Sequence, residues 1–244
     1  MANSIKVGCC GTSGLSIRRY AESYPLLEVQ KTFYELLESE LAKKWRSYVK
    51  NDFEFTMKVF QGITHPIDSP TWKRSLRFLS GIDPADVGLL QASKFVTYCW
   101  NRSVEFAKAL QAKVLVIQLP PSFQYNNKNV ERLKMFFSHF EPDIPCAIEF
   151  RHESWLNKID ELNIILKRWR TIIISDPLKF RLPQQEIQYL RLHGLDGFTN
   201  YRYTYSDEEI NTLINRLKGL TAFVLFNNIS MLDDAKRLLT RLQG

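Results

Sequence analysis

The chain has 244 residues and a formal net charge of +7, and 45% of its residues are hydrophobic. This length suits one large domain or two small ones, and the apolar fraction is sufficient for a substantial core. The basic charge favours anionic partners, although no tract of five or more basic residues is present. No apolar run approaches the roughly 18 residues of a membrane span, and the N-terminus lacks a leader pattern. We therefore expect a cytoplasmic protein with no membrane partner.

Short apolar runs recur along the chain, and most of them are separated by stretches with helical periodicity. The eight runs cover residues 5–10, 26–33, 53–60, 114–120, 146–152, 171–176, 187–193 and 222–228. Strands that alternate with helices predict βα units and a parallel sheet. Eight such units in about 250 residues predict an α/β fold of the (β/α)8, TIM-barrel-like class. Because the alternation never breaks, we expect a single domain over residues 1–244.

The helical stretches between these runs have apolar residues every three or four positions. They cover residues 34–49, 92–110, 129–140, 154–169 and 231–242, and a further helix begins at Ser206 with the sequence SDEEI. This serine and the acidic residues after it are typical of a helix N-terminus. The interval 61–113 is too long for one βα connection. We therefore expect a long insertion after the third strand, which lies over the mouth of the barrel.

Nearly all the apolar runs end in polar or charged residues. In a TIM barrel the active site lies at the carboxyl ends of the strands, so these residues mark the expected site. They are Glu28, Gln30, Thr32, Lys58, Gln118, Glu149, Arg151, His152, Asp176, Arg191, His193, Asn227 and Asn228. Side chains alternate along a strand, so residues of equal parity share a face. We expect Glu28, Gln30 and Thr32 to point into the barrel.

By the same alternation, Glu149 and Arg151 lie on one inward face, and Tyr189, Arg191 and His193 on another. Buried charges are costly unless they pair. The charged residues could therefore form a structural ion-pair network rather than an active site, and the sequence leaves both interpretations open.

Several stretches of the sequence resemble the YecE-like family. They are EVQKTFY from Glu28, KVFQGITHP from Lys58, IQLPPSF from Ile117, AIEFRHESW from Ala147, YLRLHG from Tyr189, YTYSDEEI from Tyr203 and LFNN from Leu225. The resemblance spans almost the whole chain in the same order. It departs at Gln30, where the family pattern has asparagine, and at Leu15, where the pattern has tryptophan after its glycine. The resemblance implies a TIM-barrel-like fold and a domain of unknown function, and it implies no reaction.

Four residues are candidate catalytic groups: Glu149, His193, Asp176 and Lys58. Burial would raise the pKa of Glu149 and Arg151 would lower it, and the sequence does not decide between them. His193 either transfers protons near neutral pH or caps the following loop. Lys58 is expected to bind an anion rather than to form a Schiff base, which needs a dry pocket and a lowered pKa. Asp176 is expected to orient the reacting groups.

A second set of residues is expected to bind the substrate: Arg151, Arg191, Gln118, Glu28, Gln30, Thr32, Asn227, His65 and His152. Arginine suits bidentate recognition of phosphate or carboxylate. His65 either leans over the barrel mouth or caps a turn before Pro66. His152 is expected to turn outward at the start of the next loop.

Standard motifs are absent from the sequence. Glu28, Glu149, Asp176 and His193 are metal-ligand types, but no HxH, HxxxH or HExxH spacing occurs, so we predict no metal. No GxGxxG, GxxxxGK[ST] or GxSxG pattern occurs, so no nucleotide cofactor is expected. The four cysteines form no CxxC, which predicts buried free thiols.

The favoured hypothesis is an enzyme, a hydrolase or an isomerase, that acts on a small phosphorylated or carboxylated substrate at the barrel mouth. One alternative is a metal-assisted hydrolase of nucleic acid or phosphodiesters, which would bind in a salt-dependent way. The other is a non-catalytic barrel that binds a metabolite or a partner. The fold does not decide among these functions. The sequence also leaves the oligomeric state open.

Overall fold

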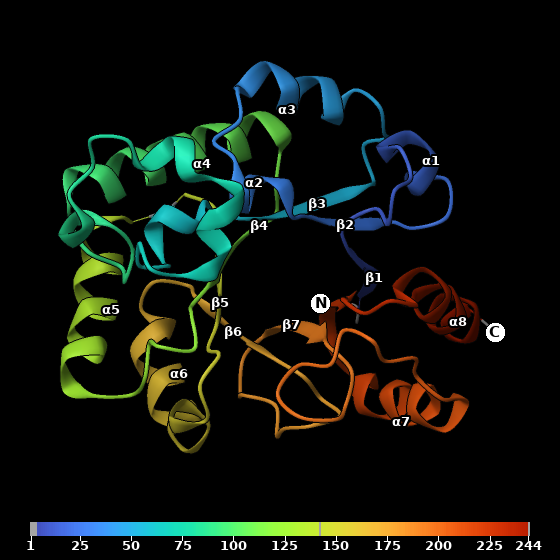
Figure 1. The fold of residues 1–244 in the computed structure, drawn as a ribbon. Helices are drawn as coiled ribbons and strands as arrows, with labels where there is room; N and C mark the ends of the chain where they lie inside the picture. Colours follow the sequence, from blue (N-terminus) through green and yellow to red (C-terminus); the bar gives the residue numbers. More distant parts are fainter. Residues whose placement is uncertain (1–3, 142, 244) are drawn as a thin grey trace.

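In a computed structural model the chain forms a closed barrel of eight parallel strands in the order β1 to β8, with β8 paired to β1 (Figure 1). The structure describes residues 4–141 and 143–243. The strands are β1 Ile5–Cys10, β2 Leu26–Val29, β3 Glu54–Lys58, β4 Val114–Gln118, β5 Cys146–Glu149, β6 Ile172–Ser175, β7 Ile187–Leu192 and β8 Thr221–Phe226. The predicted (β/α)8 class is therefore confirmed. The extent of the domain stays a prediction over residues 1–244, of which 1–3, 142 and 244 lie outside the described part.

Helices cover the outside of the barrel (Figure 1). They are α1 Ile17–Ala21, α2 Lys31–Tyr34, α3 Ser39–Arg46, α4 Lys94–Leu110, α5 Asn127–His139, α6 Ile159–Lys167, α7 Asp207–Leu217 and α8 Met231–Gln243. Ser206 caps α7 with a capping box that includes Glu209, as the sequence predicts. Strand β6 is followed by turns over residues 176–186 instead of a helix. None of the helices in the described ranges is both long and apolar enough to cross a membrane.

Several predicted elements are wrong in their extent, such as the helix predicted over 154–169, whose α-helical part is Ile159–Lys167. Two of these differences affect the site. The strand predicted over 26–33 ends at Val29, because the chain then turns into α2 and Thr32 donates a hydrogen bond to the backbone oxygen of Lys58 at 2.7 Å. The helix predicted over 34–49 begins at Ser39, because Glu35 is extended and the backbone oxygen of Tyr34 accepts from Ser75 at 2.6 Å. Alternation along β2 therefore does not apply to Thr32.

The segment between β3 and α4 is a long insertion without a strand or α-helix. It contains the 3-10 helices η1 Gln61–Ile63, η2 Pro70–Arg74, η3 Leu76–Leu79 and η4 Pro84–Asp86. The backbone N–H groups of Gly88, Leu89 and Leu90 donate to residues 62–64 at 2.9–3.0 Å, so the insertion folds back on itself. It lies beside α2 and α4 (Figure 1).

Two apolar clusters form the core. The larger cluster fills the layer between strands and helices. The smaller cluster lines the inside of the barrel with Cys10, Leu26, Val114, Val116, Ala147, Ile174, Tyr189 and Leu225. Near the amino ends of the strands, Lys6 pairs with Glu54 at 3.7 Å. All four cysteines are buried and free, as expected. The apolar lining leaves the carboxyl ends of the strands as the place where charges gather inside the barrel.

Candidate functional site

Charged and amide side chains from several strands meet inside the barrel at its carboxyl end. Glu28 ends β2, Lys58 ends β3, Gln118 ends β4, Glu149 ends β5 and Arg191 lies on β7. Residues that pair in register point to the same side of the sheet. Glu28, Lys58 and Arg191 pair with Cys10, Val116 and Leu225, which belong to the apolar cluster inside the barrel. Gln118 and Glu149 pair with each other. Together with two residues from the loops that follow β5 and β7, these strand residues are the mouth cluster: Glu28, Lys58, Gln118, Glu149, Arg151, Arg191 and His193.

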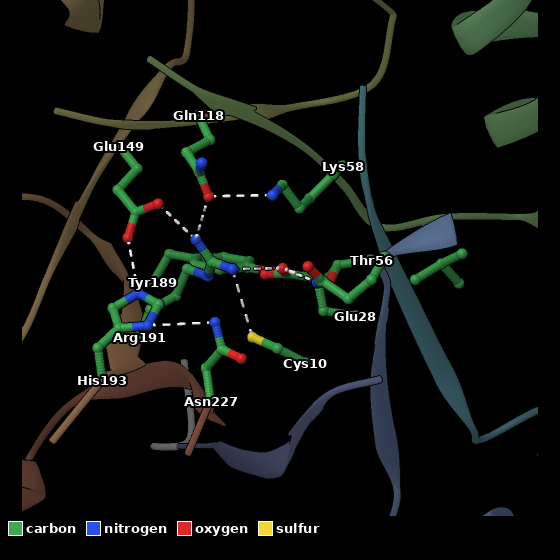
Figure 2. Close-up of polar contacts among 12 residues, drawn as sticks. Cys10, Glu28, Thr56, Lys58, Gln118, Glu149, Tyr189, Arg191, His193 and Asn227 are labelled. Carbon is green, nitrogen blue, oxygen red and sulfur yellow. Dashed lines mark hydrogen bonds and ion pairs between the residues drawn. The ribbon is translucent and has the colours of Figure 1, made fainter. Parts of the chain in front are cut away.

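Arg191 lies at the centre of the mouth cluster, and 1% of it is exposed (Figure 2). Its Nη2 donates to Glu28 Oε1 at 3.0 Å, and its Nη1 donates to Glu149 Oε2 and to Gln118 Oε1, the latter at 3.3 Å. Its Nη2 also lies 3.5 Å from Cys10 Sγ. Through its pairs with Glu28 on β2 and Glu149 on β5, Arg191 on β7 connects three strands that are not neighbours in the barrel.

Glu149 is held as a carboxylate. In addition to Arg191, its Oε2 pairs with Arg151 Nη2 at 2.9 Å, and its Oε1 lies 2.9 Å from His193 Nε2. Burial alone would raise the pKa of Glu149, but Arg151, Arg191 and His193 outweigh burial and hold that pKa well below its usual range. The competition that the sequence left open is therefore decided in favour of the ionised form, which orients its neighbours.

His193 is neutral, and both of its ring nitrogens have partners. The amide nitrogen of Asn227 can only donate, and it lies 3.1 Å from His193 Nδ1 (Figure 2). With Nδ1 as the acceptor, Nε2 donates to Glu149 Oε1 at 2.9 Å, and Arg151 Nη2, which can also only donate, lies 3.3 Å from the same Nε2. Burial lowers the pKa of His193 to about 3, even though Glu149 favours the charged form. Proton transfer by His193 stays a prediction, and it would have to start from the neutral ring.

Gln118 accepts hydrogen bonds from three cationic side chains at once. Its Oε1 lies 3.0 Å from Lys58 Nζ, 3.1 Å from Arg151 Nη2 and 3.3 Å from Arg191 Nη1. Lys58 makes no ion pair with any carboxylate in the described part of the chain, and its Nζ lies 3.8 Å from the ring centre of Phe33. Burial, and then the charge of Arg191, lower the pKa of Lys58 to about 7. This point of the mouth cluster is strongly electropositive.

Sequence reasoning did not select some residues that support the mouth cluster from below. Tyr189 donates to Glu28 Oε2 at 2.7 Å, and Thr56 lies 2.7 Å from the same tyrosine hydroxyl. Thr56 is two residues before Lys58 and Cys10 is the register partner of Glu28, so strand alternation and register could have found both. Gln30, which was selected, also donates to Glu28.

Asp176 follows β6 and stands apart from the ion pairs. Its Oδ1 accepts from the backbone N–H of Leu178 at 3.0 Å, and its Oδ2 has no hydrogen-bond partner among residues 4–141 and 143–243. Burial raises the pKa of Asp176 to about 6. Asp176 lines a cavity of about 480 Å³, together with Glu149, Arg191 and His193.

Besides Asp176, three selected residues make no hydrogen bond to the side chains of the mouth cluster. Thr32 bonds to the backbone of Lys58. His65 bonds to Thr64 at 2.8 Å and packs edge-on against Phe33, with ring centres 5.0 Å apart. His152 caps the 3-10 helix Glu153–Lys158, where its Nδ1 accepts from the backbone N–H of Ser154 at 3.1 Å. Substrate contact by these residues stays a prediction that the observed bonds do not support.

The described ranges contain no group of three or more His, Cys, Asp or Glu residues arranged to hold a metal ion. Glu28 and Glu149 are both bonded to Arg191. The sequence interpretation of Glu28, Glu149, Asp176 and His193 as a ligand set is therefore not matched by their arrangement.

The variant Asp176→Asn is expected to raise the free energy of unfolding by about 1–3 kcal/mol near pH 7.5. The folded protein keeps the proton of Asp176 up to a pKa of about 6, whereas the ordinary value is 3.8, so ionisation costs stability as the pH rises through 6. Below about pH 3 both states are protonated and the gain should vanish. Urea unfolding at the two pH values measures the difference. An equal gain at both, or an equal gain for the exposed control Asp68→Asn, would contradict it.

The chain as a whole is similar to known proteins. The family described as "Protein of unknown function DUF72" matches residues 11–244, which confirms the resemblance to the YecE-like family. The UPF0759 protein YunF of Bacillus subtilis (strain 168) is 24% identical over 91% of this chain and 85% of its own length. The crystal structure of the DUF72 protein EF0366 from Enterococcus faecalis V583 is 20% identical with a TM-score of 0.72, and covers 99% of this chain and 98% of EF0366. A D-psicose 3-epimerase crystallised with D-fructose has a TM-score of 0.55 at 12% identity, over 98% of each chain, which is a likeness of fold alone.

Proposed function

We propose that this chain, which belongs to the DUF72 family of proteins of unknown function, is an enzyme that acts on a small phosphorylated or carboxylated metabolite. The observation that carries the proposal is the meeting of Lys58, Arg151 and Arg191 at one neutral amide oxygen, Gln118 Oε1, within 3.0–3.3 Å. The substrate's anionic group would bind at this point of the mouth cluster.

The charge balance of the mouth cluster supports an anionic ligand. Below a pH of about 7, where Lys58 is protonated, three cationic side chains face two carboxylates, Glu28 and Glu149, and His193 is neutral because its pKa is about 3. A structural ion-pair network would need only balanced charges, so the additional cation is left unexplained by that alternative. A phosphate or carboxylate oxygen is a stronger acceptor than an amide oxygen, and the arginine forks suit it.

Two groups have pKa values that suit proton transfer, Lys58 at the anion site and Asp176 in the cavity beside the mouth cluster. Asp176 has a pKa of about 6 and Lys58 a pKa of about 7, and both values result chiefly from burial. General acids and bases work best when their pKa lies near the operating pH. This supports an enzyme over a barrel that only binds. Glu149 and His193 are bonded to each other and to Arg151 or Asn227, and they orient the site.

The test is anion binding to Arg151→Gln, measured by titration calorimetry with inorganic phosphate and D-ribose 5-phosphate. We expect binding of both probes to weaken by about 10- to 100-fold, since charge-assisted hydrogen bonds are worth about 1.5–3 kcal/mol. Arg216→Gln removes the same charge from an exposed position on α7 and should bind as the parent does. Equal binding by Arg151→Gln and the parent, or no binding of either probe to the parent, would refute the proposal.

Turnover separates an enzyme from a binding barrel. Incubation of the bound sugar phosphate in deuterated water, followed by NMR, should show exchange of a carbon-bound proton or a new product. That signal should fall about 100-fold or more in Asp176→Asn if Asp176 moves a proton. Tight binding without exchange or product would favour the non-catalytic barrel.

A further inference from the structure

A cavity of about 480 Å³ lies beside the mouth cluster, at the carboxyl ends of β5, β6 and β7. It is flanked by residues 179–183 of the turn segment that follows β6 in place of a helix. Its volume falls in the range of about 300–1,000 Å³ that is usual for small-molecule sites. Glu149 and Arg191 line this cavity and also belong to the mouth cluster, so the cavity lies directly beside the cluster.

Two residues that line the cavity each carry a buried polar atom without a hydrogen-bond partner in the described part of the chain. The atoms are Asp176 Oδ2 and Arg191 Nε. Asp176 is 6% exposed and Arg191 is 1% exposed. Buried polar groups nearly always have partners, and each exception calls for an explanation. A ligand that offers both a donor and an acceptor would satisfy both atoms, and a hydroxyl group does so.

The rest of the wall excludes other kinds of ligand body. Phe150, Phe180 and Phe198 give it apolar faces, which suit the C–H faces of a carbon skeleton. A purely apolar body would leave Asp176 Oδ2 and Arg191 Nε unpaired in a dry site, which is costly. The wall carries charges of both signs, with Lys179, Arg181 and Arg191 against Glu149, Asp160 and Asp176, so it favours a body without net charge.

We infer that this cavity binds the uncharged, hydroxyl-bearing body of the substrate whose anionic group is held at Gln118, Lys58 and Arg151. The inference rests on the proposed function and narrows its substrate class to phosphorylated or carboxylated polyhydroxy compounds. Asp176 takes a hydrogen bond from a hydroxyl group of this body. Arg191 connects the two parts of the site, because its Nη1 contacts Gln118 at 3.3 Å and its side chain also lines the cavity.

The experiment compares three phosphates that differ only in the body attached to the anionic group. Inorganic phosphate has no body, n-pentyl phosphate has an apolar body, and D-ribose 5-phosphate has a hydroxylated body with the same number of carbons. In calorimetric titrations of the parent protein, D-ribose 5-phosphate should bind at least about tenfold more tightly than n-pentyl phosphate. Equal affinities for these two compounds would overturn the inference while the proposed anion site stood.

Two variants test where the hydroxylated body binds. Asp176→Asn keeps the oxygen that accepts from Leu178 and replaces Oδ2 with an N–H donor, so it should remove most of the tenfold preference. Leu182→Trp fills the cavity from its wall and should weaken D-ribose 5-phosphate by about tenfold. Both variants should bind inorganic phosphate as the parent does. Leu76→Trp, at an exposed position, is the control and should change nothing.

A neutral probe separates failure of the inference from failure of the anion site. Xylitol carries hydroxyl groups and no anion, and its binding can be detected by saturation-transfer NMR at high concentration. A xylitol signal that disappears in Leu182→Trp supports the cavity even if inorganic phosphate does not bind. If xylitol gives no signal, or if Leu182→Trp and Asp176→Asn weaken inorganic phosphate as much as D-ribose 5-phosphate, the cavity is not the site of the body.

Discussion

Arg191→Met is expected to lower the free energy of unfolding by about 5 kcal/mol, since removing one partner of a buried ion pair costs about 3–5 kcal/mol. Glu28 would have no cationic partner left among the described residues, and Glu149 would keep Arg151 and His193 but lose Arg191. Glu28 and Glu149 both bond to Arg191 inside the barrel. Domains of ordinary stability unfold at a cost of about 5–15 kcal/mol, so the variant should be marginal at 25 °C. Urea unfolding followed by circular dichroism measures the change.

A further variant tests whether the loss of stability comes from the carboxylates of Glu28 and Glu149 that lose the charge of Arg191. The triple variant Glu28→Gln, Glu149→Gln, Arg191→Met should regain at least about half of the lost stability, because the amides need less compensation than buried carboxylates. The matched control Arg216→Met, on the exposed face of α7, should change stability by less than about 0.5 kcal/mol. A triple variant no more stable than Arg191→Met would show that the loss comes from packing and not from charge.

Lys58→Met is expected to act in the opposite direction and to raise the free energy of unfolding by about 2–3 kcal/mol near pH 7. The Lys58 ammonium is buried beside Arg191 and lacks a carboxylate partner in the described ranges, and its pKa falls from 10.5 to about 7. This shift corresponds to about 5 kcal/mol at most, from which the lost contacts with Gln118 and Phe33 must be subtracted.

The pH dependence of Lys58→Met has a definite sign. In the parent, the unfolded chain keeps the Lys58 proton up to about pH 10.5 and the folded protein releases it near pH 7. The cost of burying the charge is therefore complete below pH 7 and is lost as the pH rises from 7 to 10.5. The gain from Lys58→Met should shrink over the same range. Lys128→Met, at an exposed position, is the control, and a gain independent of pH would show that the buried charge is not the cause.

Together, these two variants separate structure from function within one cluster. Arg191 holds the barrel together through Glu28 and Glu149. Lys58 contributes a charge that the fold does not need, and inorganic phosphate binding should fall by about tenfold or more in Lys58→Met. Stability gained at the cost of ligand binding is common at active sites. A Lys58→Met protein that is more stable and binds phosphate normally would remove Lys58 from the anion site.

Strand alternation accounts for much of the candidate site. It predicts that Glu28, Glu149 and Arg191 point into the barrel, where they meet. It fails for Thr32, because α2 begins where the strand was expected to continue. His152, which was expected to begin the next loop, caps the 3-10 helix that follows β5, and its contact with substrate stays a prediction.

The sequence by itself determined the fold class, because eight apolar runs alternating with amphipathic stretches can bury their apolar faces together in a (β/α)8 barrel. It also determined which end of the barrel carries charge. Only the tertiary structure decided which charges pair and which do not. The pKa of Glu149 falls because Arg151, its near neighbour in the sequence, and then Arg191 from β7 both pair with it, and Lys58 is left without a carboxylate among the described residues. Such pairings and the cavity beside Asp176 depend on distances between distant residues, which no local pattern contains.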